Sequence, residues 1–197
     1  MRNSILELLR ASGLEPVSGE KISEQLGVSR TAIWKHIQAL KDEGYQIESV
    51  QKRGYILREA PNRLYPQEIS SHLKTKWLGH SVCYEDLLPS TNNVAKSIAN
   101  AGCENGLLVI AEEQGAGKGR LSRGWVSPHA KGIWFSVVLK PPFLPQEASK
   151  CTLLAAVAVV KAVNKIQGVN AAIKWPNDIL LNGRQLVGIL TEMNAEF

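Results

Sequence analysis

A short proline-containing stretch, EAPNRLYPQ at 59–67, divides the chain into two parts with different residue patterns. Proline has no backbone N–H and disfavours helix in the residue before it, so two prolines this close together interrupt regular structure. A chain of 197 residues is long enough for two small domains. We therefore expect a first domain at 1–60, a linker at 61–67 and a second domain at 68–197.

The part before this stretch has the pattern of three helices followed by two short strands. Ile33, Ile37 and Leu40 recur at the spacing of one helix face, and Gly27 and Gly44 end two of the helices. The segments YQIESV and GYILRE alternate apolar and polar residues around QKRG, as the strands of a hairpin do. This order of elements predicts a winged helix-turn-helix.

The third helix and the hairpin tip carry polar residues suited to DNA. In this motif the third helix enters the major groove, and cations at the tip reach phosphates. The residues expected to contact DNA are Ser29, Arg30, Thr31, Lys35, Gln38, Lys52 and Arg53. The alternative is an ordinary solvated surface, because 1–60 hold nine Lys/Arg against eight Asp/Glu. One copy would bind weakly, so we expect a dimer that reads two half-sites.

The composition of the whole chain indicates a cytoplasmic protein without a membrane partner. Its formal net charge of +5 is spread along the chain, which permits anionic partners without requiring them. The longest apolar run, CTLLAAVAVV at 151–160, is about half the ~20 residues of a membrane span. Glu7 and Arg10 interrupt the N-terminal apolar stretch, unlike a signal peptide. The three cysteines are widely spaced, which fits a reducing compartment.

The segment QGAGKGRLSRGW at 114–125 combines glycines with cations directly after a predicted strand. Glycines let backbone N–H groups approach an anion closely, and the cations neutralise it. Two common phosphate loops are excluded by spacing. A P-loop alignment places Glu112 where the first glycine belongs, and the third glycine of a dinucleotide fingerprint falls on Arg120 or Ser122. The segment is either another kind of anion-binding loop or a mobile surface turn with solvated cations.

Three segments occur in the order and at the intervals typical of biotin protein ligases, namely STNNVAK (90–96), EEQGAGKGRLSRGWVSP (112–128) and KWPNDILLNGRQLVGIL (174–190). The N-terminal SGEKISEQLGVSRTAIWKHIQALKDEGY resembles the DNA-binding domain of the bifunctional class, which also represses the biotin operon. The resemblance spans essentially the whole chain. It implies an α+β protein, in which a winged helix-turn-helix precedes a catalytic domain related to class II aminoacyl-tRNA synthetases.

The resemblance also implies a reaction in two steps. Biotin and Mg-ATP give biotinoyl-5′-AMP and pyrophosphate, and the mixed anhydride then acylates a lysine of a biotin carboxyl carrier protein, as in acetyl-CoA carboxylase. When unmodified carrier is scarce, the loaded protein would form a homodimer and occupy operator DNA. The strand at 184–192 is then a candidate dimer surface.

Site residues follow from the motifs they match. The residues implied to bind biotin are Ser90, Thr91, Asn92, Gln114, Lys118, Gly119, Arg120 and Lys174. Those implied to hold ATP or the adenylate are Lys118, Arg120, Arg123 and Lys174, with Arg120 and Lys174 as the catalytic residues. Asp178 is a candidate Mg²⁺ ligand, although a structural role at a turn is favoured slightly.

The chain departs from the family pattern at three positions and at its end. Lys118 stands where arginine is usual, which replaces a two-pronged donor with a point charge, and Gly115 and Gln185 replace other residue types. We expect weaker retention of the adenylate and an unchanged reaction. TEMNAEF stops where the family continues with further strands, a loop over adenine and an SH3-like barrel. We therefore expect an incomplete catalytic domain.

Two other functions stay open. One is a transcription factor that senses biotin after losing ligase chemistry, although Lys174 and Arg120 argue against that loss. The other is a lipoate-type ligase, whose related fold acylates the same kind of carrier lysine. Such ligases differ at the glycine-arginine loop and normally lack the DNA-binding half.

Overall fold

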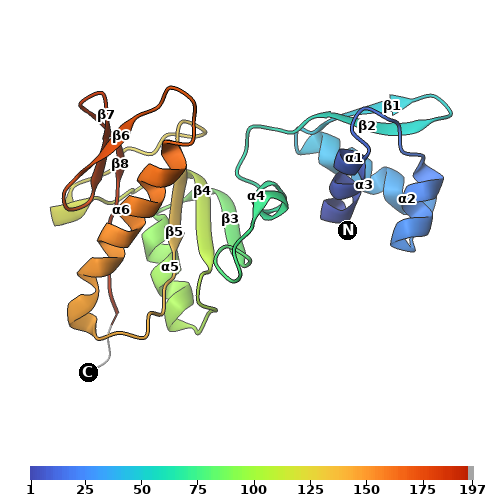
Figure 1. The fold of residues 1–197 in the computed structure, drawn as a ribbon. Coiled ribbons are helices and arrows are strands. Elements are labelled where there is room, and N and C mark those ends of the chain that lie inside the picture. Colours follow the sequence, from blue (N-terminus) through green and yellow to red (C-terminus); the bar gives the residue numbers. More distant parts are fainter. Residues whose placement is uncertain (195–197) are drawn as a thin grey trace. The chain divides into compact units, whose positions relative to one another are not determined.

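A computed structural model describes residues 1–194, and the chain forms two compact units, Met1–His72 and a second that begins at Leu73 (Figure 1). The helices and strands follow the predicted order, with a winged helix-turn-helix first and a mixed α+β domain after it. In the described part of the chain, no helix is long and apolar enough to cross a membrane.

The first unit contains three helices and a two-stranded wing. These elements are α1 (Arg2–Ala11), α2 (Gly19–Leu26), α3 (Arg30–Asp42), β1 (Gln46–Val50) and β2 (Gly54–Glu59). Ser18 Oγ caps α2 by accepting from Lys21 N at 3.1 Å, and Ser29 Oγ caps α3 by accepting from Ala32 N at 3.2 Å. Gly27 ends α2 in the left-handed conformation. These signals are local, so the sequence pattern predicts them.

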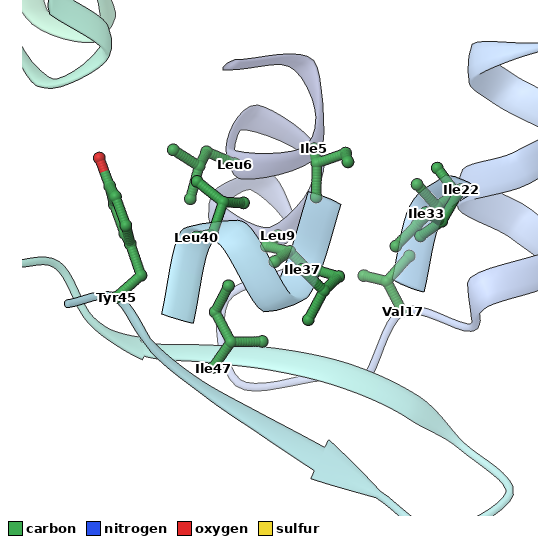
Figure 2. Packing of buried hydrophobic residues seen from close by; sticks show 10 residues of the cluster. All are labelled: Ile5, Leu6, Leu9, Val17, Ile22, Ile33, Ile37, Leu40, Tyr45 and Ile47. Atoms are coloured by element: carbon green, nitrogen blue, oxygen red, sulfur yellow. The ribbon is translucent and has the colours of Figure 1, made fainter. Parts of the chain in front are cut away.

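The core of the first unit joins the three helices to the wing (Figure 2). Its buried members are Ile5, Leu6, Leu9, Val17, Ile22, Ile33, Ile37, Leu40, Tyr45 and Ile47. The side chain of Ile47 points from β1 toward Leu9 and Ile37 (Figure 2). Burying an aliphatic side chain of this size contributes about 1.5–3 kcal/mol, so this cluster fixes the position of the wing on the helices.

A β-bridge holds the wing against the segment between α1 and α2. Val17 N donates to Tyr55 O, and Tyr55 N donates to Val17 O, both at 2.9 Å. Gly54 precedes this bridge with φ +121°, and a Cβ there would lie 2.0 Å from Val17 O. Only glycine fits this position without moving the backbone.

The segment expected as a linker continues into helix α4 (Pro66–His72), and both belong to the first unit. Glu68 accepts hydrogen bonds from Arg10 Nη2 and from Tyr45 OH, each at 2.5 Å. Burial and the hydrogen bond to Glu68 raise the pKa of Tyr45 well above its usual range. The partners of α4 come from α1 and from the start of the wing, which the local pattern at 59–67 does not reveal.

The first sheet of the second unit has the strand order β3-β4-β5. It consists of β3 (Val82–Leu88), β4 (Leu108–Gln114) and β5 (Trp134–Val137). Helix α5 (Thr91–Asn100) connects the parallel strands β3 and β4, whereas β5 runs antiparallel to β4. Leu88 pairs with Gln114, so β3 and β4 end at the same edge of the sheet. Loops that follow these two strands therefore meet there.

The second sheet is an antiparallel arrangement of β6 (Ala171–Lys174), β7 (Asp178–Leu181) and β8 (Arg184–Gly188). Its predicted hairpin turns at Asn182 and Gly183, both with positive φ, as a two-residue turn of this kind requires. Helix α6 (Ser149–Val163) packs on β6 and β7 and ends four residues earlier than the expected Gln167. Two short 3-10 turns, η1 (Arg120–Ser122) and η2 (Pro145–Glu147), complete the elements of the described residues.

Replacing Gly54 by alanine should destabilise the first unit by about 3 kcal/mol, because the new Cβ overlaps Val17 O and the left-handed backbone disfavours side chains. Gly13→Ala is the matched control, since Gly13 also has positive φ but no atom lies within 4 Å of its Cβ position. It should cost about 1 kcal/mol. Deuterium exchange of peptides from 1–60 measures both. Equal costs would contradict the steric explanation.

Candidate functional site

The candidate site lies where β3 and β4 end and α5 begins. Gly115 N donates to Leu88 O at 2.9 Å, and Ala116 N donates to Pro89 O at 2.8 Å. These bonds join the loop after β3 to the start of the glycine loop. Binding loops at strand ends are carried by a rigid scaffold, which is the arrangement seen here.

A chain of buried polar side chains runs beneath this edge. Ser90, Thr91, Ser127 and Ser136 are all nearly inaccessible to solvent. Gln114 Oε1 accepts from Thr91 N at 2.8 Å, and Gln114 Nε2 donates to Ser127 Oγ at 2.9 Å. Ser136 Oγ lies 2.8 Å from Thr91 Oγ1. Polar groups are buried at a cost unless they are hydrogen-bonded, so this chain is a built feature of the fold.

The motif around 90–96 implied that Ser90 binds biotin, and the structure adds a detail about this residue. Ser90 occupies the N-cap position of α5, yet its side chain makes no capping hydrogen bond. The N–H of Thr91, the first residue of the helix, bonds instead to the side chain of Gln114. Gln114 thus performs the capping that a serine normally provides.

The glycine loop is folded back on itself rather than extended. Trp125 N donates to Gly117 O at 2.8 Å, and Gly119 N donates to Arg123 O at 2.7 Å. A Cβ on Gly117 would lie 2.3 Å from Trp125 O, so the two arms of the loop approach as closely as backbones can. Leu121 is in the left-handed conformation at the loop tip and is 84% exposed. The loop has fixed arms and a solvent-exposed tip.

Two cations of the loop reach different elements. Lys118 Nζ donates to Asn93 Oδ1 on α5 at 2.7 Å, and Arg120 Nη1 donates to Asn177 Oδ1 at 2.7 Å. Both side chains are exposed, so an incoming anion can reach them. Lys118 and Arg120 are therefore placed around the edge where Gln114 ends β4.

Lys174 is the third cation that was expected at this group. Lys174 ends β6 with an exposed side chain, in register with Asp178. None of the hydrogen bonds or ion pairs among residues 1–194 joins Lys174 to the glycine loop. Arg123 is likewise exposed beyond the tip of the loop. The roles expected of these two cations stay predictions.

Asp178 is held by amide groups at the start of β7. Its Oδ1 accepts from Gln185 Nε2 at 2.8 Å and from Asn177 Nδ2 at 3.1 Å. Gln185, one of the three departures from the family pattern, thus orients this carboxylate. Among the described residues, no group of three or more His, Cys, Asp or Glu side chains is placed to hold a metal ion.

Glu192, which the sequence pattern did not single out, completes the site. Asn92 Nδ2 donates to Glu192 Oε2 at 3.0 Å, and Lys96 Nζ lies 3.4 Å from Glu192 Oε1. The hydrogen bond from Asn92 lowers the pKa of Glu192, with smaller contributions in the same direction from Lys96 and Lys118. Lys96 sits in the STNNVAK motif, but Glu192 lies a hundred residues from Asn92, so spacing could not connect them.

A buried carboxylate lies on the strand that leads into the glycine loop. Glu112 is 2% exposed and accepts from Tyr84 OH at 3.0 Å. Burial and this hydrogen bond raise the pKa of Tyr84 far above its usual range. Glu112 therefore ties β4 to β3 just before both strands reach the site.

The outward face of α3 forms the candidate nucleic-acid surface of the first unit. Arg30, Thr31 and Lys35 are exposed, and Gln38 is half-buried. Ser29 accepts the capping bond of α3, so its oxygen is engaged by the helix. The sequence analysis missed Trp34, which is 53% exposed on the same helix.

The wing adds two cations to this unit. Lys52 has φ 60° at the tip of the wing and, like Arg53, an exposed side chain. Arg53 Nη2 lies 3.6 Å from Glu15 Oε2, and both side chains are well exposed. An ion pair of this kind contributes little, so it leaves Arg53 available for a phosphate.

Comparison with known proteins connects both units to described families. The model of the biotin/lipoate A/B protein ligase family matches residues 84–196, which is more than half of the chain. A second family model, described as an HTH domain, matches residues 2–56. The two matches fall on the two compact units.

Individual relatives agree with these matches. The bifunctional ligase/repressor BirA of Bacillus subtilis is 47% identical over 196 residues, which cover 100% of this chain and 60% of that protein. BirA of Escherichia coli is 34% identical over 179 residues, covering 91% of this chain and 54% of that protein. The chain thus spans about 60% or less of these relatives. The biotin protein ligase of Aquifex aeolicus, solved with biotin and ATP, is 25% identical with a TM-score of 0.50, covering 58% of this chain and 47% of that one.

Replacing Gly117 by alanine should open the glycine loop, because its Cβ would overlap Trp125 O and Ser127 Oγ. We expect a loss of about 2 kcal/mol in the free energy of unfolding and faster deuterium uptake across 115–128. Gly115→Ala is the control, since no atom lies within 4 Å of its Cβ position. It should change stability by less than about 0.5 kcal/mol. Indistinguishable behaviour of the two variants would refute this account of the loop.

Proposed function

Since this chain belongs to the biotin/lipoate A/B protein ligase family, we propose that it activates biotin with ATP and transfers the biotinyl group to a carrier lysine. A biotin carboxylate oxygen attacks the α-phosphorus of ATP, and pyrophosphate leaves. The lysine amine of a biotin carboxyl carrier protein then attacks the acyl carbon, and AMP leaves. The Aquifex enzyme, which was solved in complex with biotin and ATP, supports biotin as the acid.

One observation carries this proposal, namely the buried polar chain that ends beside the cationic loop. The hydroxyl and amide groups of Ser90, Thr91, Asn92 and Gln114 are the types that pair with a ureido ring, whose own donors and acceptors need partners when buried. Lys118 bonds to Asn93, the residue after Asn92 on α5, and Arg120 bonds to Asn177. A ligand with a ureido ring at one end and a carboxylate at the other matches this order.

The cations of the site reduce the electrostatic repulsion that opposes the first step. A carboxylate and a phosphate repel each other, and fixed positive groups and N–H donors offset that repulsion as they meet. We assign the carboxylate and the α-phosphate to Lys118, Gly119, Arg120 and Lys174, and the rest of the nucleotide contact to Arg123. Lys118 is a point charge on Asn93 where the family usually has arginine, so it should retain the adenylate less firmly.

Mg²⁺ would enter with the nucleotide. This ion is bound in proteins through one or two carboxylates together with substrate phosphates and water. Asp178 is the carboxylate of the KWPND motif, and it connects through Asn177 to Arg120. It can supply one oxygen, while the ion would neutralise charge on the phosphates.

The first unit supports a second part of the proposal, which is regulation of transcription. We propose that the winged helix-turn-helix binds operator DNA and that adenylate binding favours a homodimer that occupies two half-sites. The exposed cations of α3 and the wing support DNA binding, and the named relatives are repressors as well as ligases.

Three free cysteines and the use of ATP favour a cytoplasmic location.

Pyrophosphate exchange tests the ligase proposal. With ATP and labelled pyrophosphate, exchange should depend on biotin, and Arg120→Ala should lower its rate about a hundredfold because one charge-stabilising donor is lost. Arg184→Ala, which removes an exposed arginine from β8, is the matched control and should keep the rate. Lipoate-dependent exchange would select a lipoate ligase. Biotin binding without exchange would select a sensor that has lost its chemistry.

Binding of a labelled random-sequence DNA duplex tests the regulatory proposal. Lys35→Ala should weaken binding severalfold and reduce the slope of log affinity against log salt by about one, because one phosphate contact is lost. Trp34→Ala should weaken binding without changing that slope, since its side chain is uncharged. Lys161→Ala on α6 removes the same charge from the other unit and should have no effect. An unchanged salt slope in Lys35→Ala would remove this residue from the interface.

A further inference from the structure

We propose that Glu192 is a positioning residue, which fixes the orientation of the Asn92 amide and, through it, the direction of the buried hydroxyl hydrogen bonds at Thr91 and Ser136. The effect on biotin rests on the proposed function, whereas the effect on Asn92 is independent of any ligand. Neither the motifs nor the spacing of the sequence assigns a role to Glu192.

The amide nitrogen of Asn92 faces acceptors only. Asn92 Nδ2 lies 3.0 Å from Glu192 Oε2 and 3.4 Å from Leu190 O. An ionised carboxylate and a carbonyl cannot donate, so the opposite orientation would place the amide oxygen against two acceptors. Lys96 lies 3.4 Å from the other carboxylate oxygen, and the pKa of Glu192 is lowered by these contacts. Glu192 therefore remains charged and holds one orientation.

This orientation points the amide oxygen of Asn92 toward Ser136. The Ser136 hydroxyl contacts both Asn92 Oδ1 and Thr91 Oγ1 but has a single proton. The amide oxygen has no proton to give, so the Ser136 proton belongs to this contact, and Ser136 Oγ can then only accept from Thr91. The Thr91 hydroxyl has a second acceptor in Gln114 Oε1 at 3.1 Å, but the shorter contact of 2.8 Å with Ser136 Oγ needs its proton once Ser136 donates to Asn92. Gln114 Oε1 keeps its bond from Thr91 N at 2.8 Å. Glu192 thus sets the direction of the hydrogen bonds that run from the Thr91 hydroxyl to Ser136 and from Ser136 to Asn92.

The consequence concerns which polar atoms a ligand meets. With Glu192 in place, Asn92 offers an oxygen whose second lone pair accepts a ligand N–H, as a ureido ring supplies. If the amide turns over, the same position offers N–H groups, and the Ser136 proton turns toward Thr91. At Asn92 the site would then no longer prefer a ligand N–H group over a ligand hydrogen-bond acceptor.

A plain structural role is the competing explanation. In that case Glu192 would only fasten the segment at 190–192 to α5 through Asn92 and Lys96. Loss of this fastening would weaken all ligands equally and would not alter the preference between chemically different rings. The two explanations therefore predict different effects of a Glu192 variant on the ratio of the affinities for two ligands with chemically different rings.

The test uses the full chain with the variants Glu192→Gln and Lys96→Gln. Glutamine keeps the size of Glu192 but can face Asn92 with either its oxygen or its nitrogen. Lys96→Gln is the matched control, because it removes the ion pair and leaves the carboxylate against Asn92. The ligand-free readout is the side-chain NH₂ signal of Asn92 by NMR, and the probes for binding are biotin and 2-iminobiotin, whose ring carries an imine in place of the ureido oxygen.

We expect a protected Asn92 NH₂ signal in the wild type and in Lys96→Gln, and loss of that protection in Glu192→Gln. Biotin should bind Glu192→Gln about tenfold more weakly, as expected for a lost bond to a charged group, and the ratio of the two dissociation constants should narrow. An unchanged Asn92 signal, or weakening of both probes by the same factor, would overturn the proposal. A wild type that binds no biotin would instead contradict the proposed function, while the NMR signal would still decide the orientation.

Discussion

The rest of the site depends on the hydrogen bonds made by the side-chain amide of Gln114. Its oxygen accepts from the first N–H of α5, and its nitrogen donates to Ser127 Oγ. Helix N-termini carry unpaired N–H groups, and Ser90 makes no side-chain cap for α5. One side chain therefore joins the end of β4, the start of α5 and the returning arm of the glycine loop. The parallel pairing of β3 and β4 is what brings these three segments to one edge.

Close backbone approach supplies the second constraint. Gly117 lies so near Trp125 O that no side chain fits, and the ring of Trp125 lies against Gly188 of β8, where a Cβ would be 2.9 Å from a ring atom. The glycine loop is thereby fastened to both sheets of the second unit. Lys118 and Arg120 are each held by a hydrogen bond before any ligand arrives, and preorganised charge is what a reaction between two anions requires.

Much of the fold follows from short-range signals. The serine caps of α2 and α3, the apolar stripe of α3 and the Asn182-Gly183 turn each depend on residues within a few positions of one another. The motifs around 90–96, 112–128 and 174–190 likewise identify the family and most of the polar residues of the site. Periodicity does not predict α4 as part of the first unit, because Glu68 is bonded to Arg10 and Tyr45, far away in the chain.

By itself, the sequence determined the order of the elements, the two-part organisation and the chemical types gathered at the glycine loop, since these are written in local spacing and in motifs. Only the tertiary structure decided that Gln114 caps α5, that Trp34 is exposed on α3 and that Glu192 meets Asn92 across a hundred residues of chain. It also placed Lys174 at the exposed end of β6, where its expected role at the glycine loop stays a prediction. The physical reason is that hydrogen-bond direction and burial depend on which distant segments of the chain pack together. The spacing of residues along the sequence does not predict those long-range contacts.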